Sequence, residues 1–366
     1  MDTLLAPAVR PTGLERAAMA GVAGRVVGEA VWAPSVHNTQ PWWFTADPGG
    51  LCLYADPARQ LATADPDGRE MLISCGAALF TARLALRAAG WIPEVQILPD
   101  PARPLLVARL TWRRRSARTG YERRLSAQVR LRRSHRGGFG PLPLAPELVA
   151  LLQQSAARYG TVLQVITDEG TRAALAEAVQ AAERAMQLDS ARVRERAAWT
   201  SPPGSTRLDG VPATAYPARA ERTVPYFPAP DFARGRGWGL PPLSTVPGRF
   251  AGTVCLLAAT ADTPADWVSA GQALQRIVLT NAAWGVATAL HSQPFELGWG
   301  NRLAGSRPGL YPQLLLRMGA TVQAAGGVRR PPASVLFTAG PGAEPQAGRP
   351  RRPAVEPDRL PGTLAG

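Results

Sequence analysis

Two long segments of this chain, residues 69–90 and 266–285, are apolar on almost every side, and they constrain its fold more than any other feature. A helix that is hydrophobic all round is buried in the middle of a protein. The two segments also align without a gap, because "SCGAALFTARLALRAAG" (74–90) matches "SAGQALQRIVLTNAAWG" (269–285). Two buried helices of matching sequence predict an internal duplication.

A strand-like match follows each helix, because "PLLVARL" (104–110) parallels "PQLLLRM" (312–318), with a small insertion in the second copy. Small residues align within the helices, Gly76 with Gly271 and Ala78 with Ala273, and they would let two backbones approach closely. We therefore predict an α+β protein whose two half-domains form a pseudo-dimer in one chain, with sheets packed on central buried helices.

The remaining periodic segments complete this outline. Helical patterns cover about 13–31, 145–160 and 168–199, and strand patterns cover 51–56, 161–167 and 252–260. Either Asp168 or Thr171 could cap the third helix.

The non-periodic stretches set the expected boundaries. Residues 200–250 are rich in Pro and Gly, and such a stretch is either a functional lid or a disordered insertion. The expected parts are a first half at 1–125, a second half at 126–340 with the lid at 200–250, and a disordered Pro/Arg/Gly tail at 341–366.

Composition excludes several classes of function. No apolar run reaches the length of a membrane span, and no signal-peptide core is evident, so we expect a cytoplasmic protein without a membrane partner. The three cysteines are far apart, which fits neither a disulfide framework nor a metal site. The net charge is +14, but all 41 basic residues are arginines spread along the chain. Because no nucleic-acid motif accompanies them, we expect no nucleic-acid partner.

The stretch "APSVHNTQPWWF" (33–44) is polar and aromatic at once, like a surface that holds a flat ligand. Asn38 can offer both donors and acceptors, and the prolines at 34 and 41 would stiffen the loop. His37 is either a hydrogen-bonding loop residue or an acid. Trp42 and Trp43 either pack in the core, which their spacing favours, or stack on the ligand.

A second stretch, "LRRSHRGGF" (131–139), lies between the two copies. Arginine forks match phosphate oxygens, and a serine hydroxyl adds a donor, so the stretch suits a phosphate monoester. The alternative is a solvated basic linker in an arginine-rich chain.

Together the two stretches resemble the nitroreductase family of FMN flavoproteins. In that family an arginine-serine motif binds the FMN phosphate, and a "PS-x-x-N-x-QPW" motif from the partner subunit contacts the flavin. Here the motifs occur in reverse order, which the resemblance explains as a fused pseudo-dimer that keeps one FMN site. The chain also has "GRE" at 68–70, "DG-x-P" at 209–212 and "PQLLLR" at 312–317, as in the dormancy-associated, Acg-like subgroup. The resemblance covers roughly residues 15–335.

The resemblance implies further contacts. Ser292 and Gln293 lie where the family passes the flavin N5 and often has a Glu-Gly pair, and Arg329 and Arg330 resemble a late basic segment that closes over the phosphate. Val36 departs from a second serine of the family motif. The expected FMN-binding residues are Pro34, Ser35, His37, Asn38, Gln40, Arg132, Arg133, Ser134, Arg136, Ser292, Gln293, Arg329 and Arg330.

By the same resemblance the chain would be an FMN-dependent oxidoreductase. NAD(P)H would deliver hydride to flavin N5, and a small nitroaromatic or quinone acceptor would be reduced, without a catalytic side chain or a metal. The alternative is a protein that stores or sequesters FMN, with the lid covering the flavin. Tyr226, Phe227 and Trp238 could either close this lid or anchor it to the body. The identity of the acceptor, the choice of NADH or NADPH, and the state as monomer or homodimer remain open.

Overall fold

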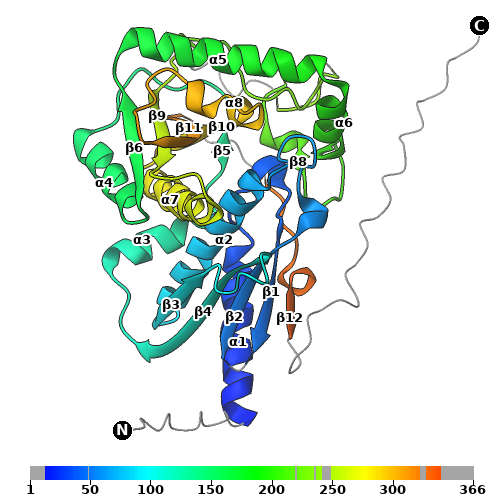
Figure 1. The fold of residues 1–366 in the computed structure, drawn as a ribbon, viewed down its shortest axis with the longest axis vertical. Helices are drawn as coiled ribbons and strands as arrows, with labels where there is room; N and C mark the ends of the chain where they lie inside the picture. The colour runs from blue at the N-terminus through cyan, green and yellow to red at the C-terminus, as the bar shows by residue number, and fades with distance from the viewer. Residues whose placement is uncertain are drawn as a thin grey trace, which may run out of the picture.

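The protein is an α+β fold in which two sheets lie on opposite sides of a central helix pair (Figure 1). The computed structural model describes residues 13–47, 49–218, 221–234, 236–240, 249–321 and 327–338. The expected tail at 341–366 lies outside these residues. The helices are α1 (Gly13–Ala30), α2 (Arg69–Ala88), α3 (Gly120–Gln128), α4 (Pro146–Ala157), α5 (Glu169–Leu188), α6 (Ser190–Ala198), α7 (Pro264–Ala283) and α8 (Gln293–Glu296).

Each sheet has five strands. The first has the order β12-β1-β2-β4-β3 and the second the order β5-β10-β11-β9-β6. The strands of the first sheet are β1 (Trp42–Asp47), β2 (Gly50–Ala55), β3 (Trp91–Ile97), β4 (Leu106–Arg115) and β12 (Leu336–Thr338). Those of the second are β5 (Ser134–His135), β6 (Thr161–Ile166), β9 (Thr253–Ala259), β10 (Ala287–His291) and β11 (Tyr311–Gly319). A separate short pair is β7 (Thr200–Ser201) and β8 (Val211–Pro212).

Four strands of each sheet repeat one pattern. In the first sheet β1-β2-β4-β3 are antiparallel throughout, and in the second β6-β9-β11-β10 are antiparallel in the same order. The central helix follows the second strand in both cases, α2 after β2 and α7 after β9. This shared topology supports the duplication that the two matching helices predict.

The fifth strands differ between the sheets. β12 pairs in parallel with β1, whereas β5 pairs in parallel with β10, at the other edge of the repeated pattern. The expected boundary at 126–340 assigns β12 to the second half, and the structure places this strand in the first sheet instead. The chain therefore returns to its first half before residue 338.

The two central helices touch at the glycines that the sequence aligns. A Cβ atom on Gly76 would lie 2.1 Å from the carbonyl oxygen of Val268, and one on Gly271 would lie 2.0 Å from that of Ile73. The two contacts are equivalent, because residues 73 and 76 align with 268 and 271. The predicted close approach of the backbones is thus confirmed, and only glycine fits at either position.

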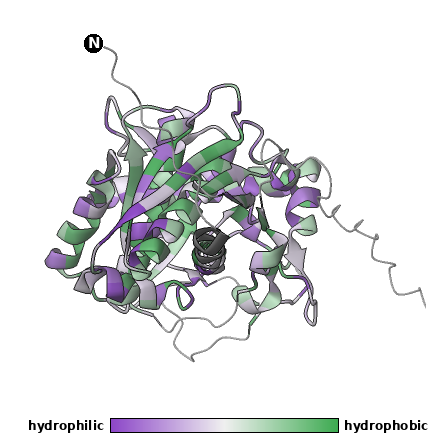
Figure 2. Ribbon diagram, turned by 90° about the horizontal axis from the view of Figure 1, so that it is seen from below, coloured by the Kyte–Doolittle hydropathy of each residue, from purple (hydrophilic) through white to green (hydrophobic). Residues whose placement is uncertain are grey.

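Burial follows from this arrangement. One apolar cluster packs α2 and α1 against the first sheet, and another packs α7 and α4 against the second. In Figure 2 the strands are largely hydrophobic, whereas hydrophilic residues are frequent on the peripheral loops and helices. Among the described residues, one helix, α2, is both long enough and apolar enough to cross a membrane. In this fold, 72% of its apolar window is buried inside the protein.

Local signals at the helix ends agree with the sequence, with one exception. Asp168 accepts from the backbone N–H of Thr171, so Asp168 is the cap of α5. The single helix expected over 168–199 is wrong, because the chain breaks at Asp189 into α5 and α6. The Asp189 carboxylate accepts from two N–H groups of the following turn and thereby starts a second helix.

We predict that Gly271→Ala lowers the free energy of unfolding by about 3 kcal/mol or more, since the new methyl group would overlap backbone that cannot move aside. Gly24→Ala on α1 is the matched control, because a Cβ there meets nothing within 4 Å and alanine favours a helix. Urea unfolding of the three proteins measures the difference. Equal midpoints for Gly271→Ala and the unchanged chain would show that the helices do not touch here.

Candidate functional site

The loop of residues 33–41 has an unusual backbone. It contains a short 3-10 turn, Val36–Asn38, and three non-glycine residues with positive φ: His37 at 44°, Asn38 at 54° and Gln40 at 50°. Such conformations are costly and persist only where the surroundings determine them, often at functional sites.

Hydrogen bonds supply those surroundings. The Ser35 hydroxyl accepts from the backbone N–H of Gln40 at 2.9 Å, which closes the loop on itself. The N–H of Val36 donates to the Ser74 hydroxyl at 3.3 Å, which fixes the loop to α2. Trp42 is fully buried, and Trp43 stacks on Tyr54 with ring centroids 3.9 Å apart. The predicted core role of both tryptophans is confirmed.

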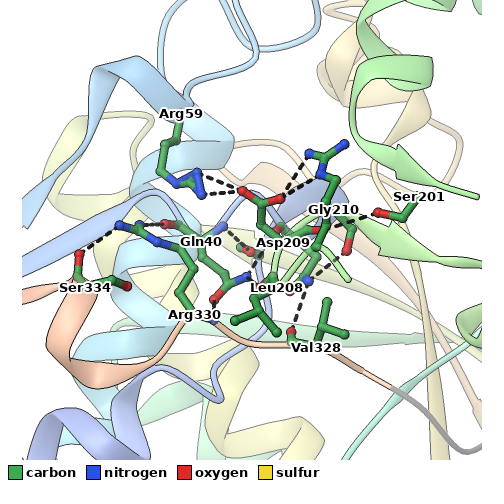
Figure 3. Close-up of polar contacts among 12 residues, drawn as sticks. Gln40, Arg59, Ser201, Leu208, Asp209, Gly210, Val328, Arg330 and Ser334 are labelled. Atoms are coloured by element: carbon green, nitrogen blue, oxygen red, sulfur yellow. Dashed lines mark hydrogen bonds and ion pairs between the residues drawn. The ribbon is translucent and has the colours of Figure 1, made fainter. Parts of the chain in front are cut away.

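The side-chain amides of the loop form hydrogen bonds to backbone groups of distant segments (Figure 3). Asn38 donates to the carbonyl of Gly210 at 2.8 Å and to that of Val328 at 3.2 Å. Gln40 donates to the carbonyl of Leu208 at 2.9 Å and accepts from the N–H of Arg330 at 2.8 Å. These two side chains therefore attach two distant segments, 208–210 and 328–330, to the loop.

The "DG-x-P" motif at 209–212 contributes further contacts that hold these segments together. Asp209 forms ion pairs with Arg59 at 2.5 Å and with Arg207 at 3.0 Å. Figure 3 shows the pair with Arg59. Gly210 has a φ of 74°, and a Cβ there would lie 2.8 Å from the carbonyl of Trp199. The motif thus anchors the segment after α6 to the loop of residues 33–41.

Two adjoining cavities open beside this loop. We call the first the inner cavity; α2, α7, β5 and β10 line it together with the loop and residues 229–232. We call the second the basic cavity; Arg132, Arg133 and Arg329 line it together with residues 211–215. Pro34, Ser35, Ser134 and Arg136 line both cavities, so a ligand could extend from one into the other.

Four guanidinium groups define the basic cavity: Arg132, Arg133, Arg136 and Arg329. None of the four forms an ion pair with a carboxylate of the described residues. Arg132 is only 4% exposed, and its Nε has no hydrogen-bond partner, nor do the Nε atoms of Arg133 and Arg329. Burial, followed by the charges of Arg133 and Arg136, lowers the pKa of Arg132 to about 10. A group of buried, charged and partly unsatisfied arginines is an anion site.

The histidines of the inner cavity are neutral near pH 7. Burial, followed by the charges of Arg196 and Arg136, lowers the pKa of His37 to about 3, so this side chain cannot serve as an acid. Burial also lowers the pKa of His135, whose Nε2 lies 2.8 Å from the carbonyl oxygen of Gly138.

His291 is paired with a buried cation that sequence reasoning missed. Arg317 is 1% exposed, and its Nε donates to His291 Nε2 at 2.8 Å. Burial and the charge of Arg317 lower the pKa of His291 well below its ordinary value. The sequence does contain an indication of this residue, because Arg317 lies within the apolar strand "LLLRMG". A charge in a buried strand is costly unless it is paired or hydrogen-bonded.

A buried acidic pair adjoins the same cavity and was also missed. Glu70 lines it directly, and Glu296 accepts from the hydroxyl of Ser292 at 2.6 Å. Burial raises the pKa of Glu70 to about 7, although its ion pair with Arg69 opposes the shift. Burial likewise raises the pKa of Glu296 to about 7, and the charge of Glu70 adds to the effect.

Most of the expected FMN-binding residues lie at the two cavities. They are Pro34, Ser35, His37, Asn38, Arg132, Arg133, Ser134, Arg136, Ser292 and Arg329. Gln40, Gln293 and Arg330 lie beside the cavities rather than along them. Gln40 and Arg330 bind each other and Arg330 donates to Ser334, while Gln293 donates to the carbonyl of Pro228. No cluster of three metal-ligating side chains occurs among the residues that the structure describes.

The described part of the segment expected to form a lid lines the inner cavity through Ala229, Pro230 and Phe232. Phe232 is 4% exposed and meets the ring of His37 edge-on at 5.6 Å. Phe227 is buried in the core of the second half, so it anchors the segment to the body. Tyr226 accepts from Gln180, and Trp238 packs beside Val211 and Tyr216. Residues 241–248 lie outside the described part.

Comparison with known proteins gives the family. Two proteins of Mycobacterium tuberculosis, both named "Putative NAD(P)H nitroreductase", are similar to this chain. The first is 32% identical over 79% of this chain and 82% of its own length, and the second, acg, is 28% identical over 78% and 85%. No protein-family profile matches the chain. The similarity to the first relative shows that the chain belongs to the nitroreductase family.

Solved structures were compared as well. A "putative nitroreductase" from Anabaena variabilis covers 86% of this chain and 90% of its own, with a TM-score of 0.43 and 11% identity. The FMN-dependent nitroreductase NfnB from Mycobacterium smegmatis, solved in complex with NADPH, covers 55% and 87%, with a TM-score of 0.32 and 16% identity.

The acidic pair predicts how stability depends on pH. The ordinary pKa of both glutamates is 4.5, so between about pH 4.5 and 7 these two carboxyls bind more protons in the folded protein than in the unfolded chain. Their contribution to the free energy of unfolding therefore falls as the pH rises through this window, by at most about 1.4 kcal/mol per unit for each carboxyl.

We predict that Glu296→Gln removes part of this dependence and stabilises the protein at pH 8. Glu177→Gln, at an exposed position of α5, is the control and should retain the full dependence. Urea unfolding between pH 5 and 8 measures both variants. The same pH dependence of stability in Glu296→Gln as in the unchanged protein would contradict the assignment.

Proposed function

We propose that this protein is an FMN-dependent NAD(P)H oxidoreductase that reduces small nitroaromatic or quinone acceptors in the cytoplasm. The observation that carries the proposal is the joining of two cavities of different character. Four arginines without an ion pair among the described residues surround the basic cavity, and the inner cavity beside it has both apolar and polar walls. FMN has the corresponding form, because a phosphate lies at one end of the molecule and a flat ring at the other.

The residues present fit this cofactor. The unsatisfied Nε atoms of Arg132, Arg133 and Arg329 are donors that a phosphate would satisfy. Ser134 lines both cavities, so its hydroxyl stands where the phosphate end meets the ring end. When bound, FMN supplies reversible hydride transfer, and the protein supplies its position and electrostatic surroundings.

The protein's own side chains set the conditions of the inner cavity. Arg317 and the neutral His291 place a buried positive charge next to the cavity wall. Such a charge favours electron-rich, reduced species over neutral ones. The lid residues Ala229, Pro230 and Phe232 limit the entry of water. Hydride transfer from NAD(P)H would require no catalytic acid in direct contact with the nucleotide.

A second candidate function is FMN storage or sequestration, and the packing of the lid favours it. Phe232 contacts His37 and lies 5.3 Å from the guanidinium carbon of Arg136. The N–H of Asp231 donates to the buried Glu183 at 3.2 Å. A lid held in this way would oppose the stacking of NAD(P)H on the flavin.

We predict that Arg132→Gln weakens FMN binding about tenfold to 150-fold, and Arg136→Gln by a similar factor. Each variant removes a charge-assisted contact worth about 1.5–3 kcal/mol. Titration of FMN into cofactor-free protein, followed by flavin fluorescence, gives the dissociation constants. Arg124→Gln, at an exposed position of α3, is the matched control and should bind normally. Unchanged affinity in both cavity variants would refute the phosphate site.

The two functions predict different responses to reductant. For the oxidoreductase, the flavin absorbance bleaches within seconds of adding NADH or NADPH without oxygen. For storage, both nucleotides leave the absorbance unchanged, whereas dithionite bleaches it. Phe232→Ala should accelerate bleaching by the nucleotide if the lid limits access. A colourless protein that takes up no added FMN would exclude both functions.

A further inference from the structure

Three features of this fold have no role in the proposed function. The surface at 113–118 is rich in arginine and exposed to solvent. The groove between α1, α2 and α3 is lined mainly by small and apolar residues, and nothing in the structure shows what covers it. The acidic pair Glu70 and Glu296 differs from both, because its side chains are buried and adjoin the inner cavity.

A third cavity lies on the other side of this pair. We call it the outer recess; Asp65, Asp67, Arg69 and Asp262 line it, and so do Glu70 and Glu296. Glu70 thus lines both the inner cavity and the outer recess. Glu296 reaches the inner cavity through the hydroxyl of Ser292, to which it is hydrogen-bonded.

Glu70 forms an ion pair with Arg69, whereas no ion pair accounts for Glu296 among the described residues. Glu296 is 7% exposed, and its Oε2 has no hydrogen-bond partner, so the side chain is an incompletely satisfied buried acid. Such a group is costly unless it is protonated or used. Asp65, in contrast, has a structural role, because its carboxylate accepts from the N–H groups of Glu70 and Met71 at the start of α2.

Resting on the proposed function, we propose that Glu70 and Glu296 carry protons from the outer recess to the acceptor bound in the inner cavity. The reaction needs such a supply. For a quinone, NAD(P)H gives two electrons and one proton as hydride, and one further proton must enter to form the hydroquinone and NAD(P)+. In that step the O–H bond of the Glu70 carboxyl breaks and an O–H bond forms on the reduced acceptor.

The surroundings suit repeated transfer. After the proton leaves, Arg69 stabilises the Glu70 carboxylate through the ion pair that the structure contains. Glu296 and water in the outer recess then restore the proton. Burial places the pKa of both carboxyls at about 7, where an acid can both give and regain a proton.

Burial also raises the pKa of Asp65, to about 6, but its carboxylate is held by the N–H groups of Glu70 and Met71. The remaining groups around the pair behave differently. His37, His135 and His291 face the inner cavity, and burial lowers the pKa of each, so all three are neutral near pH 7. Arg136 and Arg317 face it as cations. Glu183 and Arg196 form a buried ion pair with each other at 2.6 Å, and Asp67, Arg192 and Asp262 line the outer recess.

The first test is independent of turnover. Infrared spectra of the full-length protein as purified should show the carbonyl band of a protonated carboxylic acid, which disappears as the pH rises through about 7. Glu296→Gln should lose part of this band, and Glu177→Gln should retain all of it. A protein without such a band at pH 6 has ionised carboxylates at both positions, and the proposal is then wrong.

The second test measures the transfer itself. Flavin in the protein is reduced with dithionite without oxygen and mixed with a water-soluble 1,4-benzoquinone, so the result does not depend on NAD(P)H. We expect the rate of reoxidation to fall as the pH rises above 7. In Glu70→Gln it should be lower by about a hundredfold or more and nearly independent of pH. Glu70→Asp should restore part of the rate and the pH dependence.

The outcomes separate the proposal from the proposed function. Rates and pH profiles in Glu70→Gln and Glu296→Gln that equal those of Glu177→Gln overturn the relay, even if NAD(P)H reduces the protein. If NAD(P)H does not bleach the flavin but Glu70→Gln lowers the rate of reoxidation as expected, the relay stands and the NAD(P)H oxidoreductase function is refuted. If the protein binds no FMN, both proposals are refuted.

Discussion

The close contact of α2 and α7 at Gly76 and Gly271 is the constraint on which the rest of the structure depends. Each sheet packs on one of these helices, so the spacing of the helices sets the spacing of the sheets. The inner cavity has walls from both helices, Ile73 and Ser74 of α2 and Leu274 of α7. A larger distance between the two helices would separate these walls. The geometry of the candidate site therefore depends on glycine at positions 76 and 271.

The sequence allowed prediction of the features that depend on local pattern. The buried helices were visible as segments that are apolar on almost every side, their contact as aligned glycines, and the start of α5 as an aspartate before a helical run. The break at Asp189 was not, because a strong helix-forming pattern continues on both sides of it. The position of β12 was also hidden, because strand pairing across about 290 residues leaves no local signal.

The missed residues of the site show the same limit. Arg109 and Arg317 occupy matching positions in the two copies and looked equivalent. Arg109 is 39% exposed and pairs with Asp47, whereas Arg317 is buried against His291. Their difference comes from what packs over each strand, which is a property of the whole fold. The raised pKa values of Glu70 and Glu296 likewise depend on their burial in the folded chain, which no short motif encodes.

The motif of residues 33–41 has a role in this chain that its resemblance to a flavin-contacting motif did not suggest. Asn38 and Gln40 use their amide N–H groups on the main chain of residues 208–210 and 328. The motif therefore connects the start of the lid and the return of the chain to the first sheet.

Asp231, further along the lid, binds Glu183, which is paired with Arg196 of α6. Because α6 also holds residues 63 and 64 through Glu195, the lid, the helix and the entrance to α2 form one connected network. The described part of the lid is held by this hydrogen bond to a charged group, worth about 1.5–3 kcal/mol, and by the burial of Phe227 and Phe232. The same network thus fixes both the motif loop and the segment that lines the inner cavity.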